Sequence, residues 1–112
     1  MLSSIFAQEA FAQKIVKDQV NADGVRVVDY QPSSAVCSRL IHIEVKDGVI
    51  LEASYKGGCH GNTQGISALI RGMKVDEAIR KIEGIDCAGR GTSCPDQLAK
   101  ALKEIKRTSK KK

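Results

Sequence analysis

The strongest constraint on the fold is a pair of alternating segments that are joined by Asp47-Gly48. In the first segment a mostly apolar set of positions alternates with a more polar set. The mostly apolar set is Arg39, Ile41, Ile43 and Val45, and the more polar set is Leu40, His42 and Glu44. The second segment has the corresponding sets Val49, Leu51, Ala53, Tyr55 and Ile50, Glu52, Ser54. An Asp-Gly pair tolerates the positive φ angles of a tight hairpin turn. Residues 39–55 are therefore predicted to form an antiparallel hairpin with one apolar face.

The segments on either side predict a further strand and three helices. The stretch GVRVVDY, residues 24–30, is β-branched enough for a short strand. Apolar residues at helical spacing predict a short helix from Ile66 to about Gly72, a second helix in VDEAIRKIEG and a last helix with the stripe Leu98, Ala99, Leu102, Ile105. Because the strands precede the helices, we expect an α+β fold in which helices pack on one face of an antiparallel sheet.

The two ends of this pattern are less regular. Residues 4–19 carry a broken apolar stripe, which favours a loosely amphipathic helix or an adaptable extension. At the start of the last helix, Pro95 suits the first helical position and Cys94 falls at the N-cap.

The composition indicates a single small domain with little stability to spare. The chain has 112 residues, of which 4% are aromatic, and it contains no tryptophan. Large side chains therefore contribute little to the core, and a core of this size leaves only a small margin of stability. A bound metal ion would increase that margin.

The net charge of +5 arises in the carboxyl-terminal segment. Residues 103–112, KEIKRTSKKK, carry six of the 18 basic residues and one of the 13 acidic residues, and the charges of the preceding residues cancel. Such a run is usually a solvated, frayed tail. The alternative is an arm that makes weak, non-specific contact with nucleic acid through its phosphates.

No membrane or export segment is recognisable. No apolar run approaches the length of a membrane span, and Glu9 interrupts an amino terminus that also lacks the basic start of a signal peptide. We therefore expect a cytoplasmic protein without membrane contact. Disulfides are disfavoured in that reducing compartment.

Four cysteines lie at the ends of predicted elements, in loops that can converge: Cys37, Cys59, Cys87 and Cys94. Their spacing lacks the CxxC pairs of zinc ribbons. It leaves three possibilities open, which are a metal site, free or redox-active thiols, and disulfides.

Local chemistry favours the metal site. Cys94 begins a helix, whose unpaired N–H groups and positive dipole end stabilise a thiolate. Cys59 lies in the glycine-rich stretch GGCHGNTQG, whose backbone N–H groups are accessible to an anion or a cluster sulfur, although turn formation explains these glycines equally well. We expect His60 to support the site without ligating the metal, and His42 to be a surface or cross-strand residue.

The segment from Cys37 to Leu102 resembles the TSCPD domain family. The family takes its name from a five-residue motif, which in this chain is Thr92, Ser93, Cys94, Pro95 and Asp96. The resemblance covers about residues 35–105 and includes all four cysteines. This family occurs as small stand-alone proteins and as a terminal appendage of cobalamin-dependent ribonucleotide reductases. The resemblance implies a metal-binding domain at 35–105, after an extension at 1–34 with a loose helix and a short strand, and before a basic disordered tail at 106–112.

A more distant resemblance is to the U-type iron–sulfur scaffold proteins. It rests on the order of hairpin, GGC loop, GMKVDEA helix and cysteine-led last helix, and it implies the same sheet with helices on one face. The three scaffold ligands fall on Cys37, Cys59 and Cys94. Arg39 replaces an acidic residue of the scaffold pattern and Ser93 replaces a histidine. The additional Cys87 favours a closed four-thiolate site that holds its metal over an open site that passes it on.

Together the resemblances imply a small four-cysteine domain that binds zinc or an iron–sulfur cluster. We expect an accessory or interaction module linked to ribonucleotide reduction, with a ribonucleotide reductase or another protein as partner. The alternatives are a thiol redox protein that carries the label ribonucleoside-diphosphate reductase, and an iron–sulfur cluster carrier. A complete reductase is not expected, because its radical-housing barrel does not fit into 112 residues. Thiolate ligands accept either metal centre, so the choice between them stays open.

Overall fold

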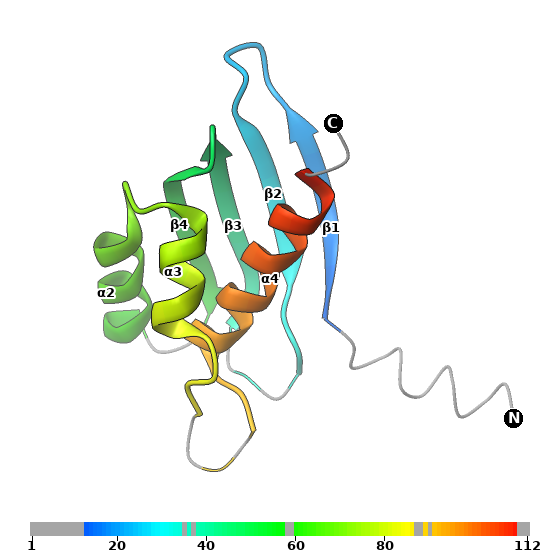
Figure 1. Ribbon diagram of the computed structural model, residues 1–112. Coiled ribbons are helices and arrows are strands. Elements are labelled where there is room, and N and C mark those ends of the chain that lie inside the picture. Colours follow the sequence, from blue (N-terminus) through cyan, green and yellow to red (C-terminus); the bar gives the residue numbers. More distant parts are fainter. Residues whose placement is uncertain are drawn as a thin grey trace, which may run out of the picture.

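A four-stranded antiparallel sheet carries three helices on one of its faces (Figure 1). The computed structural model describes residues 13–34, 36, 38–57, 60–86, 89 and 91–109. The strands are β1 (Lys14–Val20), β2 (Arg26–Gln31), β3 (Ser38–Lys46) and β4 (Val49–Gly57), and the helices are α2 (His60–Ile70), α3 (Val75–Ile82) and α4 (Cys94–Ser109). The strands lie in sequence order across the sheet. The α+β prediction is confirmed, whereas the likeness to the U-type scaffold fold stays a prediction.

The predicted hairpin is present as β3 and β4. Asp47 and Gly48 form its turn with φ angles of 53° and 77°, as the Asp-Gly pair predicted. On β3 the predicted apolar face is buried at Ile41, Ile43 and Val45.

A β-bulge changes the predicted apolar face of β4. Val45 pairs with Ile50, and Glu44, the residue before Val45, pairs with Glu52, so Leu51 is an extra residue in the ladder. A bulge of this kind shifts the alternation of the strand by one position. As a consequence Ile50 is buried and Leu51 is exposed, the reverse of the prediction.

The amino-terminal strand corrects the prediction for residues 4–19. Residues 14–19 belong to β1, which pairs antiparallel with β2 from Lys14 opposite Gln31 to Val20 opposite Arg26. They are part of the sheet and do not form the loosely amphipathic helix that was the first of the two predictions for this stretch. Residues 4–12 lie outside the described part of the chain.

Two helices are longer than predicted. α2 begins at His60, inside the stretch that was expected to be a loop, and ends close to Gly72 as predicted. α4 continues to Ser109, so residues 106–109 are helical and do not belong to a disordered tail. Residues 110–112 lie outside the described range.

The core lies between the sheet and the helices α3 and α4. The apolar faces predicted for these two helices are buried: Val75, Ala78, Ile79 and Ile82 on α3, and Leu98, Ala99, Leu102 and Ile105 on α4. This packing fixes α4 across the sheet, with its first turn beside the start of β3 and the end of β4.

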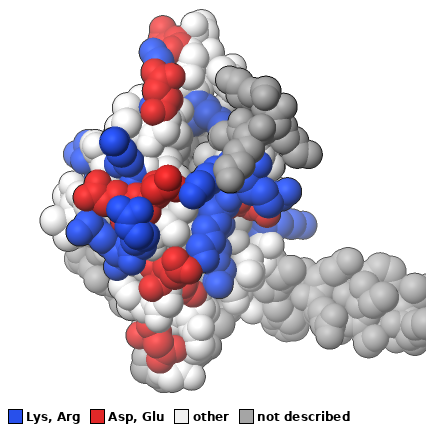
Figure 2. All heavy atoms as spheres, in the orientation of Figure 1, with Lys and Arg blue, Asp and Glu red and all other residues white. Residues whose placement is uncertain are grey.

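Basic and acidic side chains are interleaved over the face that α3 and α4 form (Figure 2). Two ion pairs join α4 to α3 and to the residue that follows it, Lys106 to Asp76 and Lys103 to Glu83, and a third, Arg107 to Glu104, lies within α4. No described helix is both long enough and apolar enough to span a membrane.

Candidate metal centre

Cys94 is the one predicted ligand that lies within the described residues. It is the first residue of α4, its side chain is partly exposed, and it forms no disulfide. Cys37, Cys59 and Cys87 lie outside the described part of the chain, so their convergence on Cys94 stays a prediction. Within the described part, no group of three or more His, Cys, Asp or Glu side chains is placed to hold a metal ion.

Ser93, not Cys94, is the N-cap of α4. The Ser93 hydroxyl accepts a hydrogen bond from the Asp96 N–H at 3.1 Å, and the Ser93 carbonyl accepts one from the Gln97 N–H at 2.8 Å. These are the two bonds that define an N-cap residue. Cys94 and Pro95 therefore occupy the first two helical positions, one step later than predicted. Cys94 still lies in the first turn of the helix.

The first turn of α4 is in contact with β3 and β4 through Cys94. The Ser38 hydroxyl oxygen lies 3.1 Å from the Cys94 sulfur, and either atom can be the donor. The Tyr55 hydroxyl donates a hydrogen bond to the Cys94 carbonyl at 3.1 Å. Burial of the Tyr55 ring raises the pKa of its hydroxyl, and the nearby Cys94 side chain raises it further. Tyr55 therefore remains a donor at neutral pH.

Asp96 joins α4 to the segment that follows α3. Its carboxylate accepts hydrogen bonds from the Gly84 N–H at 2.7 Å and from the Thr92 hydroxyl at 2.6 Å, and Lys100 lies 3.7 Å away. Asp96 is 5% exposed. Burial alone raises the pKa of this carboxyl, but the hydrogen bonds from Thr92 and Gly84 and the charge of Lys100 outweigh it and lower the pKa below the ordinary value. Asp96 is thus a buried carboxylate that stays ionised.

Gln97 joins α4 to the loop between β2 and β3. Its amide oxygen accepts a hydrogen bond from the Ser33 N–H at 2.9 Å, and its amide nitrogen donates to the Thr92 hydroxyl oxygen at 3.0 Å. Gln97 is 1% exposed. No buried side-chain nitrogen or oxygen in the described part of the chain lacks a partner. A fully paired buried network of this kind holds its members in one arrangement.

These bonds anchor each of the three segments that lead to a cysteine outside the described residues. Ser33, bound by Gln97, precedes Cys37 by four residues, and Tyr55, bound by the Cys94 carbonyl, precedes Cys59 by four. The Ser93 hydroxyl donates to the Ile85 carbonyl at 2.6 Å, two residues before Cys87. All three segments are therefore hydrogen-bonded to the beginning of α4.

The loop after Ile85 is further organised by Asp86. Its carboxylate oxygens accept hydrogen bonds from the N–H groups of Gly89 and Gly91 at 2.6 Å and 2.5 Å. Both glycines have positive φ angles, 79° and 83°, which a residue with a side chain rarely adopts. The Asp86 carboxylate therefore holds Gly89 and Gly91 close to the end of the segment that follows α3.

The sequence pattern revealed only part of this arrangement. Ser93-x-x-Asp96 is a recognisable capping pattern and would have identified Ser93 as the N-cap. Nothing in the pattern singles out Ser38, Tyr55 or Gln97, because their partners lie far away along the chain.

The two histidines have different outcomes. His42 lies between the carboxylates of Asp29 on β2 and Glu44 on its own strand, at 2.7 Å and 2.8 Å. Partial burial lowers its pKa, but the hydrogen bonds to Glu44 and Asp29 outweigh this and raise the pKa above the ordinary value. The prediction of a cross-strand residue is confirmed. The side chain of His60 lies outside the described part of the structure, so its supporting role stays a prediction.

Comparison with protein-family models matches residues 14–106 to the TSCPD domain. The match covers most of the chain, from the first residue of β1 into the last turns of α4. Neither the curated proteins nor the solved structures contain a match to this chain.

Proposed function

The chain belongs to the TSCPD domain family, and from this premise we propose that it is an accessory domain that binds a metal through four cysteines. The proposed ligands are Cys37, Cys59, Cys87 and Cys94. We further propose that the domain serves ribonucleotide reduction as an interaction module rather than as a complete enzyme. When bound, zinc would stabilise the fold, whereas an iron–sulfur cluster would add electron transfer.

The observation that carries this proposal is that hydrogen bonds connect three cysteine-bearing segments to the beginning of α4. Cys37 directly precedes Ser38, whose hydroxyl lies 3.1 Å from the Cys94 sulfur. Consecutive Cα atoms are about 3.8 Å apart, so chain connectivity keeps Cys37 close to that sulfur.

The same argument extends to the other two proposed ligands. Cys59 follows Gly57 by two residues, and Gly57 pairs with Ser38 across the β3–β4 ladder. Cys87 follows Ile85 by two residues, and Ile85 is bound by Ser93. A span of two residues reaches at most about 7 Å. These short tethers support the proposal that the four cysteines meet at one centre.

The surroundings of Cys94 fit a metal-bound thiolate. The sulfur lies at a helix N-terminus and beside a hydroxyl group, and both stabilise a negative charge on sulfur. Ser93 supports a closed site over the scaffold pattern, in which a histidine occupies this position. Its hydroxyl donates to the Ile85 carbonyl and accepts from the Asp96 N–H, so it caps the helix and takes the place of the scaffold's histidine without being a metal ligand of the usual kind.

Metal content of the four single Cys→Ser variants tests the proposal. Each of the four should lower zinc or iron content per chain in protein purified without oxygen, because a closed site uses every thiolate. Ser54→Ala, an exposed change on β4, is the control for purification and folding.

The pattern of results separates the alternatives. Normal metal content in Cys87→Ser together with losses in the other three would contradict the closed site and favour an open cluster carrier. Wild-type protein that is free of metal, with four titratable thiols, would contradict metal binding and favour the thiol redox protein. Stable zinc or a coloured cluster in the wild type identifies the metal.

A further inference from the structure

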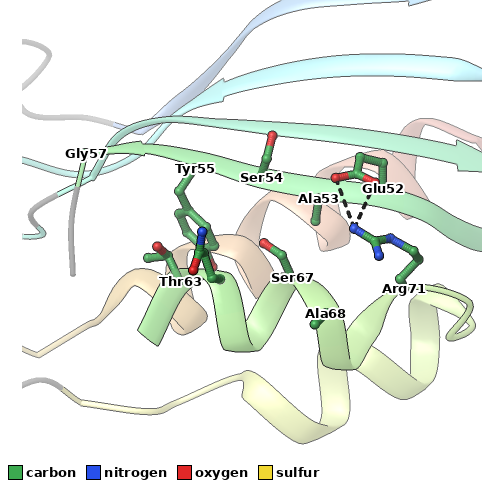
Figure 3. A pocket seen from close by; sticks show the side chains of 10 residues that line it. Glu52, Ala53, Ser54, Tyr55, Gly57, Thr63, Ser67, Ala68 and Arg71 are labelled. Carbon is green, nitrogen blue, oxygen red and sulfur yellow. Dashed lines mark hydrogen bonds and ion pairs between the residues drawn. The ribbon is translucent and has the colours of Figure 1, made fainter. Parts of the chain in front are cut away.

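A groove of about 460 Å³ runs between β4 and α2 (Figure 3). Ala53 and Tyr55 point from β4 toward the helix, and Thr63 and Ser67 point from α2 toward the strand. Ser54, on the opposite face of β4, also lines the groove. Because residues from both faces of β4 take part, the groove lies along the edge of this strand.

Among the described strands β4 lies at the edge of the sheet, with β3 as its one neighbour. An edge strand presents backbone N–H and C=O groups that have no partner within the sheet. Outside the ladder with β3, no backbone hydrogen bond among the described residues involves β4 beyond Ile50. The part of the edge that borders the groove is therefore available for pairing.

The chain itself already adds a short segment to the beginning of this edge. Lys74 pairs antiparallel with Val49, and Ile50 exchanges backbone hydrogen bonds with Gly72 and Met73 at 2.7 Å and 2.8 Å. The edge of β4 thus accepts an added strand in this fold.

The added segment ends where the groove begins. Arg71, the residue before it, lines the groove and forms an ion pair with Glu52 at 3.2 Å (Figure 3). From Glu52 to Gly57 the edge has no such cover among the described residues. A second segment of about six residues would continue the pairing that Gly72–Lys74 starts, because strands pair residue by residue.

The helical wall of the groove determines the chemistry of the occupant. None of the eleven residues of α2, HGNTQGISALI, is Asp, Glu, Lys or Arg. Its residues that line the groove are small or polar, as at the half-buried Ser67 and the exposed Ala68, so a backbone can approach closely. The two charged residues that line the groove, Glu52 and Arg71, are paired with each other, so a charged segment would find no unpaired counter-charge along this wall.

A second copy of the chain fits this place poorly. An antiparallel pair of β4 edges would place the α2 helix of each copy on the same side of the joined sheet. Because α2 already forms the helical wall of the groove, the α2 helices of the two copies would compete for one space.

We propose that the groove binds an extended, uncharged segment of a partner protein, which adds to β4 as a fifth strand. Backbone hydrogen bonds to β4 would supply affinity, and contacts with Tyr55, Thr63 and Ala68 would supply selectivity. The groove adjoins the candidate metal centre at Tyr55, whose hydroxyl bonds to the Cys94 carbonyl, whereas Ala68 lies on α2 and forms none of the bonds described at that centre.

The probe is a displayed library of random hexapeptides without Asp, Glu, Lys or Arg, screened against the full chain. We expect enriched peptides that bind the wild type and bind Ala68→Lys at least about tenfold more weakly. The lysine side chain would fill the groove. Leu69→Lys is the matched control, because Leu69 is the next residue of α2, is 74% exposed and does not line the groove. It adds the same charge and should leave binding unchanged.

A second measurement reports the strand geometry directly. A peptide that pairs with β4 uses every second N–H, so N-methylation at alternate positions should abolish binding while methylation between them is tolerated. Failure to enrich any peptide, equal binding by wild type and Ala68→Lys, or the lack of a two-residue period would each overturn the proposal.

Two further outcomes would assign the groove to other occupants and would also overturn the proposal. The first is a dimer in sedimentation equilibrium that Ala68→Lys dissociates. The second is tighter peptide binding after deletion of residues 1–12, which would show that the chain's own amino terminus competes for the groove. Metal content should be the same in Ala68→Lys and in the wild type, so a failure of this proposal is distinguishable from a failure of the metal site.

Discussion

The hydroxyl oxygen of Ser38 lies 3.1 Å from the sulfur of Cys94, across 56 residues of sequence. Ser38 is the first residue of β3 and Cys94 is the first residue of α4, so this contact joins the beginning of the strand to the beginning of the helix. Ser38 is 4% exposed, and its hydroxyl lies in a place that solvent barely reaches. The sulfur therefore has a polar neighbour that is shielded from bulk water, and a hydrogen bond in such a place is stronger than one in water.

The first prediction concerns Ser38→Ala. Loss of the hydroxyl should lower the free energy of unfolding by about 1 kcal/mol, the usual worth of one hydrogen bond. It should also speed the loss of a thiolate-bound metal, because the sulfur loses a stabilising donor. Urea denaturation and the rate of metal transfer to a chelating dye measure the two effects. Ser54→Ala, the same change at an exposed position, should alter neither. An unchanged transfer rate in Ser38→Ala would mean that the hydroxyl does not influence the metal.

The second prediction concerns Asp96→Asn at neutral pH. The amide cannot satisfy both the Gly84 N–H and the Thr92 hydroxyl as a charged carboxylate does, and it loses the attraction of Lys100. Hydrogen bonds to a charged group are worth about 1.5–3 kcal/mol, so the free energy of unfolding should fall by about 2 kcal/mol. Glu83→Gln, which removes an exposed ion pair with Lys103, should cost less than about 1 kcal/mol.

Acid should remove this difference between the wild type and Asp96→Asn. The pKa of Asp96 is lower in the folded chain than in the unfolded chain, so its ionised form stabilises the fold at every pH above the unfolded value. That stabilisation is lost as the pH falls from about 4, the unfolded pKa, through the folded pKa. The unfolding curves of the two proteins should therefore converge below about pH 4. A difference that persists undiminished at pH 2 would assign the effect to packing instead of charge.

Local patterns predicted most of the fold because they report burial. Ile41 and Ile43 alternate with polar neighbours and face the core, and the stripes of α3 and α4 are buried as expected. β1 escaped prediction since six of its seven residues are exposed, which leaves no alternation between apolar and polar positions. The bulge at Leu51 escaped prediction because it depends on pairing with β3 and not on local preference.

At the candidate centre the sequence singled out Cys94 but not the residues that surround it, and the other three proposed ligands stay a prediction. Cys94 was recognised from its place before a helix, and Ser93 could have been recognised from the capping pattern. The bond between Gln97 and Ser33 spans 64 residues, and a buried glutamine looks like any polar residue until the fold brings its partners together. Side-chain bonds over such separations are set by tertiary packing.

The third prediction concerns the carboxyl-terminal end. Truncation after Ser109 should leave the free energy of unfolding unchanged, whereas truncation after Arg107 should lower it by about 1 kcal/mol. The shorter chain lacks Thr108, whose hydroxyl oxygen lies 2.6 Å from an Arg26 guanidinium nitrogen. Thr108→Ala in the full-length chain should reproduce most of the loss. Urea denaturation measures all three proteins, and equal stability after truncation at Arg107 would show that the contact contributes nothing.

The last prediction couples metal binding to folding. Because the core is small and poor in aromatic residues, a metal that binds only the folded chain should account for a large share of its stability. A ligand present at a hundred times its dissociation constant adds about 2.7 kcal/mol, which corresponds to about 10 °C or more in the melting temperature of a domain of this size. Strong chelation should therefore lower the melting temperature of the wild type by about that amount. Cys94→Ser is the matched control, since a chain that has already lost its metal should melt at the same temperature with and without chelator. An unchanged melt of wild-type protein from which the metal has demonstrably been removed would separate metal binding from folding and leave the cysteines with a purely chemical role.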